Sequence, residues 1–222
     1  CKPLSKYWIK EMSAHFNNVK SVVLGYGAYS KVKKSLLNKL VRFETVVTAI
    51  NYFSFALVGY PYMGVGRNLA YNKKEFFKAN GFINHIKVRS GDDDLFINQV
   101  ATPENTAICL SQESFTASKP KTTYKAWLKQ KRRHVSTAKH YKRKHKILLG
   151  LLYSSNLLFW VLSSILFLAF FKWHIVLVLF LLRLFIQYFI FAASVKKLNE
   201  KDLLFFLPIL EIFLIIAQLT IF

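Results

Sequence analysis

Acidic residues are scarce in this sequence. Only 11 of its 222 residues are Asp or Glu, against 32 Lys or Arg, so the formal net charge is +21. Such an excess indicates an anionic partner, which can be nucleic acid, an anionic membrane surface or a phosphorylated substrate. Cysteine is nearly absent as well. Cys1 and Cys109 form no Cys-x-x-Cys pair, which excludes a disulfide framework and a zinc site built from cysteines.

Three of the few carboxylates are consecutive, in Ser-Gly-Asp-Asp-Asp-Leu-Phe at residues 90–96. Adjacent like charges repel each other, and a metal, a cationic substrate group or a shared proton relieves that repulsion. A solvated acidic turn is the simplest interpretation of the triplet by itself. The neighbouring motifs therefore determine whether it is a site.

Charged residues almost disappear after residue 146. The segment 147–171 has none, 175–195 is interrupted only by Arg183, and 203–222 only by Glu211. Each is about as long as the roughly 20 residues that a helix needs to cross a bilayer. Soluble helices would show a polar face, which these segments lack. The sequence therefore predicts three transmembrane helices within 147–222.

The charges beside these segments predict their orientation. Residues 119–146 contain twelve Lys or Arg and no acid, so the positive-inside rule places residues 1–146 in the cytoplasm. Residues 172–174 would form a hairpin on the far side, and Lys196, Lys197 and Lys201 would return the chain to the cytoplasm. The third helix would then end outside.

Residues 1–118 alternate between helix and strand patterns, which predicts an α/β domain. The expected elements are a helix from Ser5 to Phe16, a strand at 21–24 ended by a Gly-Tyr-Gly turn, a helix at 35–55 that is a poor membrane span, an extended run at 64–71, a helix capped by Asn72 and Glu75 and closed by Gly81, a helix at 95–100 and a strand at 106–110.

Two further motifs frame the acidic triplet. Gly64-Val65-Gly66-Arg67-Asn68 places glycines at a loop edge, and it lacks the third glycine of a dinucleotide fingerprint. A basic helix capped by Thr122 or Thr123 and running to about His140 carries Gln130-Lys131-Arg132-Arg133-His134. Most of its cations fit a collar on anionic lipid, worth about 1 kcal/mol each.

In this order, the Gly-x-Gly-Arg-Asn segment, the Gly-Asp-Asp-Asp-Leu segment, the Gln-x-x-Arg helix and the membrane spans resemble the C-terminal half of a membrane-bound family 2 glycosyltransferase. The resemblance covers about residues 1–200. It implies that residues 1–118 are the C-terminal part of a GT-A-type α/β catalytic domain. Residues 119–146 would be the juxtamembrane helix and residues 147–222 the transmembrane region.

The resemblance also implies roles for residues. The catalytic base would be Asp92 or Asp93, because the motif can be aligned in either register. The donor and acceptor site would be lined by Gly66, Arg67, Asn68, Asp94, Gln130, Arg133 and His134. His134 stands where this family usually has Trp, and an imidazole can still stack or donate a hydrogen bond.

The implied reaction is transfer of a sugar, with inversion, from a nucleotide-sugar to a lipid-linked or polysaccharide acceptor. It would occur at the cytoplasmic face of a bacterial inner membrane, with no nucleic acid involved. The family's Asp-x-Asp motif for Mg or Mn is absent, and Cys1-Lys2-Pro3 looks like the residues that follow it. We therefore expect the metal motif and the nucleotide-binding half upstream, no metal ligand in this chain, and no activity from this fragment alone.

A non-enzymatic membrane protein is the alternative interpretation. Its basic cytoplasmic domain would bind anionic lipid or nucleic acid, and the charge of +21 with the interleaved Tyr124, Trp127 and Tyr141 would suit it. This interpretation leaves the acidic triplet and the Gly-x-Gly-Arg-Asn segment without a role.

Two opposite charges lie inside the expected spans. Ionisable groups in a membrane are costly and usually paired. In antiparallel helices Arg183 and Glu211 would lie at similar depths, and Gln187 is one turn from Arg183 on the same face. We expect the second and third spans to pack with these three side chains in contact.

Overall fold

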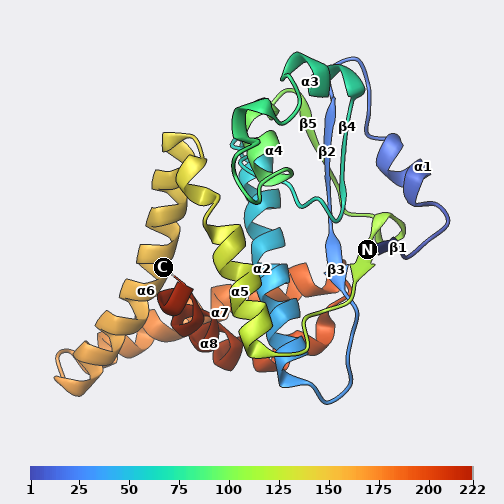
Figure 1. Cartoon of the computed structure of the whole chain (residues 1–222). Helices are drawn as coiled ribbons and strands as arrows, with labels where there is room; N and C mark the ends of the chain where they lie inside the picture. The colour runs from blue at the N-terminus through green and yellow to red at the C-terminus, as the bar shows by residue number, and fades with distance from the viewer. Residues whose placement is uncertain (222) are drawn as a thin grey trace.

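The computed structural model describes residues 1–221, which form an α/β part and a group of long helices (Figure 1). The strands are β1 (Lys2–Pro3), β2 (Val22–Gly25), β3 (Gly27–Tyr29), β4 (Leu69–Tyr71), β5 (Thr106–Cys109) and β6 (Thr116–Ser118). The α-helices are α1 (Trp8–Ser13), α2 (Leu36–Leu57), α3 (Lys73–Lys78), α4 (Asp94–Val100), α5 (Tyr124–Val135), α6 (Arg143–Leu168), α7 (Trp173–Lys197) and α8 (Leu207–Ile221). Short 3₁₀ helices are η1 (Ile83–His85), η2 (Gln112–Ser114), η3 (Ala138–His140) and η4 (Lys201–Phe206).

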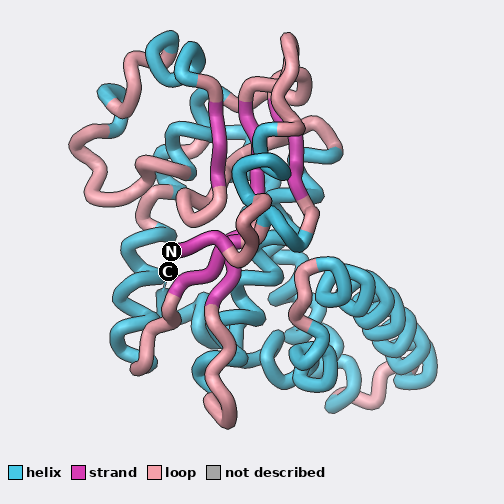
Figure 2. Tube along the Cα trace, turned by 90° about the vertical axis from the view of Figure 1, so that its right-hand side faces the viewer, coloured by secondary structure: helices cyan, strands magenta, loops and turns pink. Residues whose placement is uncertain are grey.

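The strands form two small sheets, one above the other in Figure 2. In the first sheet β2 is central, antiparallel to β4 and parallel to β5, with Val23 opposite both Ala70 and Ala107. Every residue of β2 is buried, which is why its sequence is apolar without alternation. The second sheet has the order β1-β6-β3, with β3 parallel to β6.

Helix α2 is the central element of the core. Ser35 caps it, since its hydroxyl accepts a hydrogen bond from the Asn38 N–H at 3.1 Å. In Figure 1 the helix runs between the strands and α5. Phe43, Val46 and Tyr52 are almost completely buried. The apolar character of α2 therefore serves packing against the α/β part, although its length and composition would also allow it to cross a membrane.

Four helical segments among residues 1–221 are long and apolar enough to cross a membrane, where three were expected. Besides α2 they are α6, α7 and the segment Lys201–Thr220, which contains η4 and most of α8. The apolar windows of α6 and α7 are hardly covered by the rest of the protein, and exposed apolar surface on this scale fits contact with lipid. The chain is consistent with a membrane protein.

The ends of α6 and α7 differ from the expected spans. Helix α6 begins four residues before 147, because its first turn is built from the polar residues before the apolar run. The hairpin after it closes earlier than expected, at Phe170 and Lys172, which both have positive φ angles of 50° and 41°. The third segment is divided, with η4 before α8.

Two expected helix caps were wrong. Ser5 does not cap α1; its hydroxyl accepts a hydrogen bond from the N–H of Tyr7, which occupies the cap position. Asn72 precedes α3, but its side chain makes no capping bond, so the capping box with Glu75 does not form. The prediction that Gly81 closes the turn after α3 was correct, since Gly81 has a φ of +61° and donates its N–H to the Phe76 carbonyl.

The expected Gly-Tyr-Gly turn is instead a passage from one sheet to the other. The chain continues from β2 into β3 because Tyr26 is buried in the core, and Tyr52 donates its hydroxyl to the Gly25 carbonyl at 2.8 Å. Similarly, the basic helix ends at Val135 rather than near His140. At the Gly-Tyr-Gly segment, tertiary contacts therefore override the local signal.

Candidate functional site

Asp93 lies at the start of α4, against the glycine loop. Its carboxylate accepts hydrogen bonds from two backbone N–H groups, that of Asp94 at 2.9 Å and that of Gly66 at 2.6 Å. A Cβ atom at position 66 would lie 3.0 Å from the Asp93 carboxylate, so a larger residue would push the loop away. Two of the sequence motifs therefore meet at Asp93.

The three consecutive carboxylates point to different surroundings. Asp92 is exposed and lines a shallow pocket of about 210 Å³ with His85 and Arg89. Asp94 is only 8% exposed and accepts hydrogen bonds from the hydroxyls of Thr137 at 2.5 Å and Tyr141 at 2.6 Å. Asp92 lies before α4, Asp93 is its N-cap residue and Asp94 is its first residue, so the three carboxylates have different surroundings.

The expectation that Asp94 lines the donor and acceptor site is therefore corrected. Its carboxylate ties α4 to the segment between α5 and α6, and no oxygen faces open space. Burial raises the pKa of Asp94, while the hydrogen bonds from Thr137 and Tyr141 act in the opposite direction. Its role is structural in this arrangement.

Asn68 also has a structural position, which corrects a second expectation. It is 1% exposed, and its side-chain nitrogen donates to the carbonyls of Tyr26 at 2.9 Å and Ser114 at 2.8 Å. Its side-chain oxygen accepts the indole N–H of Trp8 at 2.9 Å. Asn68 thus joins the two sheets and α1, and it is too deeply buried to line an open site.

Tyr29, at the end of β3, connects the Gly-x-Gly-Arg-Asn segment with the Gln-x-x-Arg helix. The guanidinium carbon of Arg67 lies 4.1 Å from the centre of the Tyr29 ring, and Arg67 also donates to the Ala28 carbonyl at 2.9 Å. The amide of Gln130 donates to the Tyr29 hydroxyl at 3.4 Å. Arg67 and Gln130 therefore share a partner that the sequence analysis did not identify. A tyrosine at a strand end carries no local signal of such a role.

Arg133 and His134 are exposed on α5, next to Gln130 in sequence. Removal of water by neighbouring atoms, followed by the charges of Lys131 and Arg133, lowers the pKa of His134, whereas the negative charge of Asp93 acts in the opposite direction. The lowered pKa favours the neutral imidazole. Asp93 and His134 are close enough to influence each other electrostatically.

Glu44 is a second residue that the sequence analysis missed. Its carboxylate forms an ion pair with Lys131 and accepts the Thr48 hydroxyl at 3.2 Å, which attaches α5 to α2. The sequence does contain a signal for this residue, because Glu44 is the single carboxylate in the apolar helix α2. The pair sets the position of the Gln-x-x-Arg helix relative to the core.

No cluster of three or more His, Cys, Asp or Glu side chains in residues 1–221 is arranged to hold a metal ion. The acidic triplet does not fit one either, because its carboxylates diverge and that of Asp94 is already hydrogen bonded.

A polar cluster lies among the apolar helices. The guanidinium of Arg183 donates to Gln187 at 3.3 Å and to Glu211 at 3.2 Å. These are the two contacts expected from the sequence. It also bonds to Asn156 of α6 and lies 3.9 Å from the ring centre of Phe159. The cluster therefore joins three helices instead of two.

We expect Glu211→Gln to lower the free energy of unfolding by about 1–2 kcal/mol, because it removes the negative partner of Arg183 and membrane hydrogen bonds reach about 1.7 kcal/mol. Thermal unfolding of the detergent-solubilised protein measures the effect. Gln218→Leu on the same helix is the control, and it should change stability less. Equal stability of Glu211→Gln and the original protein would exclude a stabilising clamp.

Comparisons with known proteins found no match to a family model, to a curated protein or to a solved structure.

Proposed function

We propose that this chain is the C-terminal part of an inverting, membrane-bound family 2 glycosyltransferase with a GT-A-type catalytic domain. The donor would be a nucleotide-sugar, and the acceptor a lipid-linked or polysaccharide hydroxyl at the cytoplasmic face of a bacterial inner membrane. The non-enzymatic alternative remains the outcome if no transfer is detected in the test below.

One observation supports this proposal most directly. The glycine loop at residues 64–68, the acidic triplet at 92–94 and the basic helix Tyr124–Val135 are far apart in the chain, yet contacts connect them. Gly66 contacts Asp93, and Tyr29 links Arg67 to Gln130. Sites for charged substrates are assembled in this way from several elements.

Asp93 is the stronger candidate for the general base. Two backbone N–H groups hold its carboxylate in one orientation, and a carboxylate has further lone pairs with which to accept a proton. In the proposed step the base removes the proton of the acceptor hydroxyl while that oxygen attacks the anomeric carbon and the nucleotide diphosphate leaves. Asp92 is exposed and has no such support.

The basic helix α5 carries side chains that can bind the nucleotide diphosphate leaving group. Arg133 is exposed beside Gln130, and a guanidinium can form two parallel hydrogen bonds with a phosphate. The neutral imidazole of His134 can stack on a ring or donate a hydrogen bond. A divalent cation held by residues outside this chain would supply further charge neutralisation to the diphosphate.

The test is sugar transfer by membranes containing the full-length protein, with a panel of radiolabelled nucleotide-sugars. We expect Arg133→Ala to lower transfer by roughly 10- to 100-fold, since a charged hydrogen bond is worth about 1.5–3 kcal/mol. Lys139→Ala removes another exposed cation nearby and should leave transfer almost unchanged. Absence of transfer with every donor, or equal losses in both variants, would contradict the proposal.

A further inference from the structure

Helix α4 carries polar side chains on the face that it turns toward the interior of the protein. Asp94 and Asn98 are one helical turn apart on this face, and they are only 8% and 4% exposed. A buried polar group that loses its hydrogen bonds is costly. The partners of these two side chains therefore determine how α4 is oriented about its axis.

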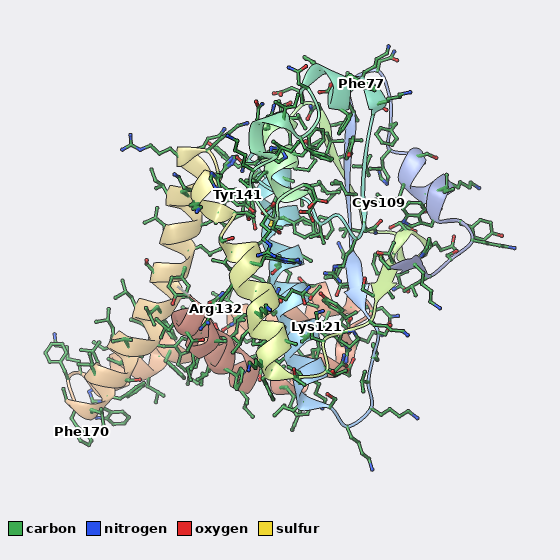
Figure 3. All side chains as sticks on the ribbon, viewed as in Figure 1. Phe77, Cys109, Lys121, Arg132, Tyr141 and Phe170 are labelled. Carbon is green, nitrogen blue, oxygen red and sulfur yellow. The ribbon has the colours of Figure 1, made fainter. Side chains whose placement is uncertain are left out.

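The segment between α5 and α6 supplies the partners of Asp94. The hydroxyls of Thr137 and Tyr141 donate to the same carboxylate oxygen, at 2.5 Å and 2.6 Å. Figure 3 shows Tyr141 between α4 and the beginning of α6. The Thr137 hydroxyl also lies 2.6 Å from the carbonyl oxygen of His134, so the end of α5 is joined to the same point.

Asn98 makes a second attachment, one turn further along α4. Its side-chain oxygen accepts the N–H of Lys142 at 2.9 Å, and its side-chain nitrogen donates to the Tyr62 carbonyl at 2.7 Å. The same nitrogen lies 2.9 Å from Nδ1 of His145, a buried residue in the first turn of α6. Helix α4 is thus held at two successive turns, and it cannot rotate without breaking hydrogen bonds of buried groups.

The orientation of α4 also determines where the carboxylate of Asp93 lies. Asp93 is the N-cap residue of α4 and directly precedes Asp94. Its carboxylate accepts the N–H of Gly66 at 2.6 Å, and Gly66 belongs to the separate glycine loop. A rotation of α4 would carry Asp93 away from that loop. The hydrogen bond between Asp93 and Gly66 therefore depends on the attachments of Asp94 and Asn98.

We infer that Thr137 and Tyr141 are positioning residues of the candidate site, which hold Asp94, fix the rotation of α4 and so keep the Asp93 carboxylate directed at the acceptor hydroxyl. The catalytic consequence rests on the proposed function. The geometric link from Tyr141 through α4 to the Asp93–Gly66 hydrogen bond is independent of it. Thr137 and Tyr141 touch no substrate in this arrangement, and they act through Asp93.

Amide hydrogen exchange of the full-length protein in detergent tests the geometric link without any substrate. We expect Tyr141→Phe to speed exchange of the Gly66 N–H by about fivefold or more, because a less firmly held Asp93 releases that group more often. Tyr52→Phe is the matched control, since it removes another buried hydroxyl, which donates to the Gly25 carbonyl of β2 at 2.8 Å. It should leave exchange at Gly66 unchanged. Unchanged exchange at Gly66 in Tyr141→Phe would overturn the inference, whether or not the protein transfers sugar.

Transfer kinetics test the catalytic consequence. Tyr141→Phe should lower kcat about 10-fold and change the KM for the nucleotide-sugar by less than about twofold, because a misplaced base slows the chemical step rather than donor binding. Thr137→Ser keeps the hydroxyl and should retain most of the activity that Thr137→Val loses. Added to Asp93→Asn, Tyr141→Phe should have no further effect on kcat, since it acts through Asp93. A purely structural role would give Tyr141→Phe and Tyr52→Phe the same kcat.

The outcomes separate this inference from the proposed function. If Asp93→Asn abolished transfer while Tyr141→Phe kept the kcat of the original protein, the positioning role would be rejected and the proposed function would stand. If Tyr141→Phe sped exchange at Gly66 but no donor supported transfer by the original protein, the proposed function would be rejected and the link from Tyr141 to Asp93 would stand.

Discussion

Asp93→Asn in the full-length protein should reduce sugar transfer by about 10²-fold or more, because general-base catalysis is typically worth 10² to 10⁴. The amide cannot take up the acceptor proton. It also cannot accept both N–H groups that now bond to Asp93, those of Gly66 and Asp94, so a small loss of stability is expected too. Initial rates at saturating donor give the catalytic effect.

Asp92→Asn is the matched control, since Asp92 is adjacent and exposed. Its transfer rate should remain within a few-fold of the original, and thermal unfolding should show that both variants are folded. If the Asp92 variant alone lost activity, the base would be Asp92 and our structural assignment would be wrong. If neither variant lost activity, neither aspartate would be the general base, and the glycosyltransferase proposal would be contradicted.

The second large effect is expected at Arg42, where α2 meets the segment after α7. Arg42 and Glu200 are each 2% exposed, and the Arg42 guanidinium donates to Glu200 at 2.9 Å and to Asp202 at 2.8 Å. Lys31 adds a bond to Asp202 at 3.1 Å from a half-exposed position. This network attaches the helical hairpin to the α/β part.

Arg42→Met should lower the free energy of unfolding by about 3–5 kcal/mol, because it leaves the buried Glu200 carboxylate without its positive partner. Lys31→Met removes a solvent-screened charge and should cost less than about 1 kcal/mol. Denaturant unfolding in detergent measures both.

A double variant separates the charge effect from packing. Arg42→Met/Glu200→Leu removes both buried charges, so it should be more stable than Arg42→Met alone. If the double variant were less stable than the single one, loss of packing rather than an unpaired charge would explain the destabilisation.

Local signals in the sequence predicted several elements well. The start of α2 at Ser35, the closure after α3 at Gly81 and the long apolar helices α6 and α7 all depend on capping, backbone freedom or hydrophobicity within one segment. Such preferences act between residues close in sequence. A pattern in the chain is therefore enough to reveal them.

The candidate site was predicted only in part. The sequence motifs identified the acidic triplet, the glycine loop and the basic helix, but they could not distinguish the roles of the three carboxylates. Asp94 is removed from the candidate site by Thr137 and Tyr141, which lie 43 and 47 residues away in the chain. Only the folded chain brings such groups together, so no local pattern carries the information.

The sequence by itself determined which segments are apolar, where the positive charge lies and which short motifs are present. Tertiary structure determined what those segments contact. Hydropathy treats α8 like α7, yet α8 rests on α5 and α2, because its covered face fits leucines into the core while its other face stays bare. Burial depends on the packing partner as well as on the residue, and the partner of a helix is set by the whole chain.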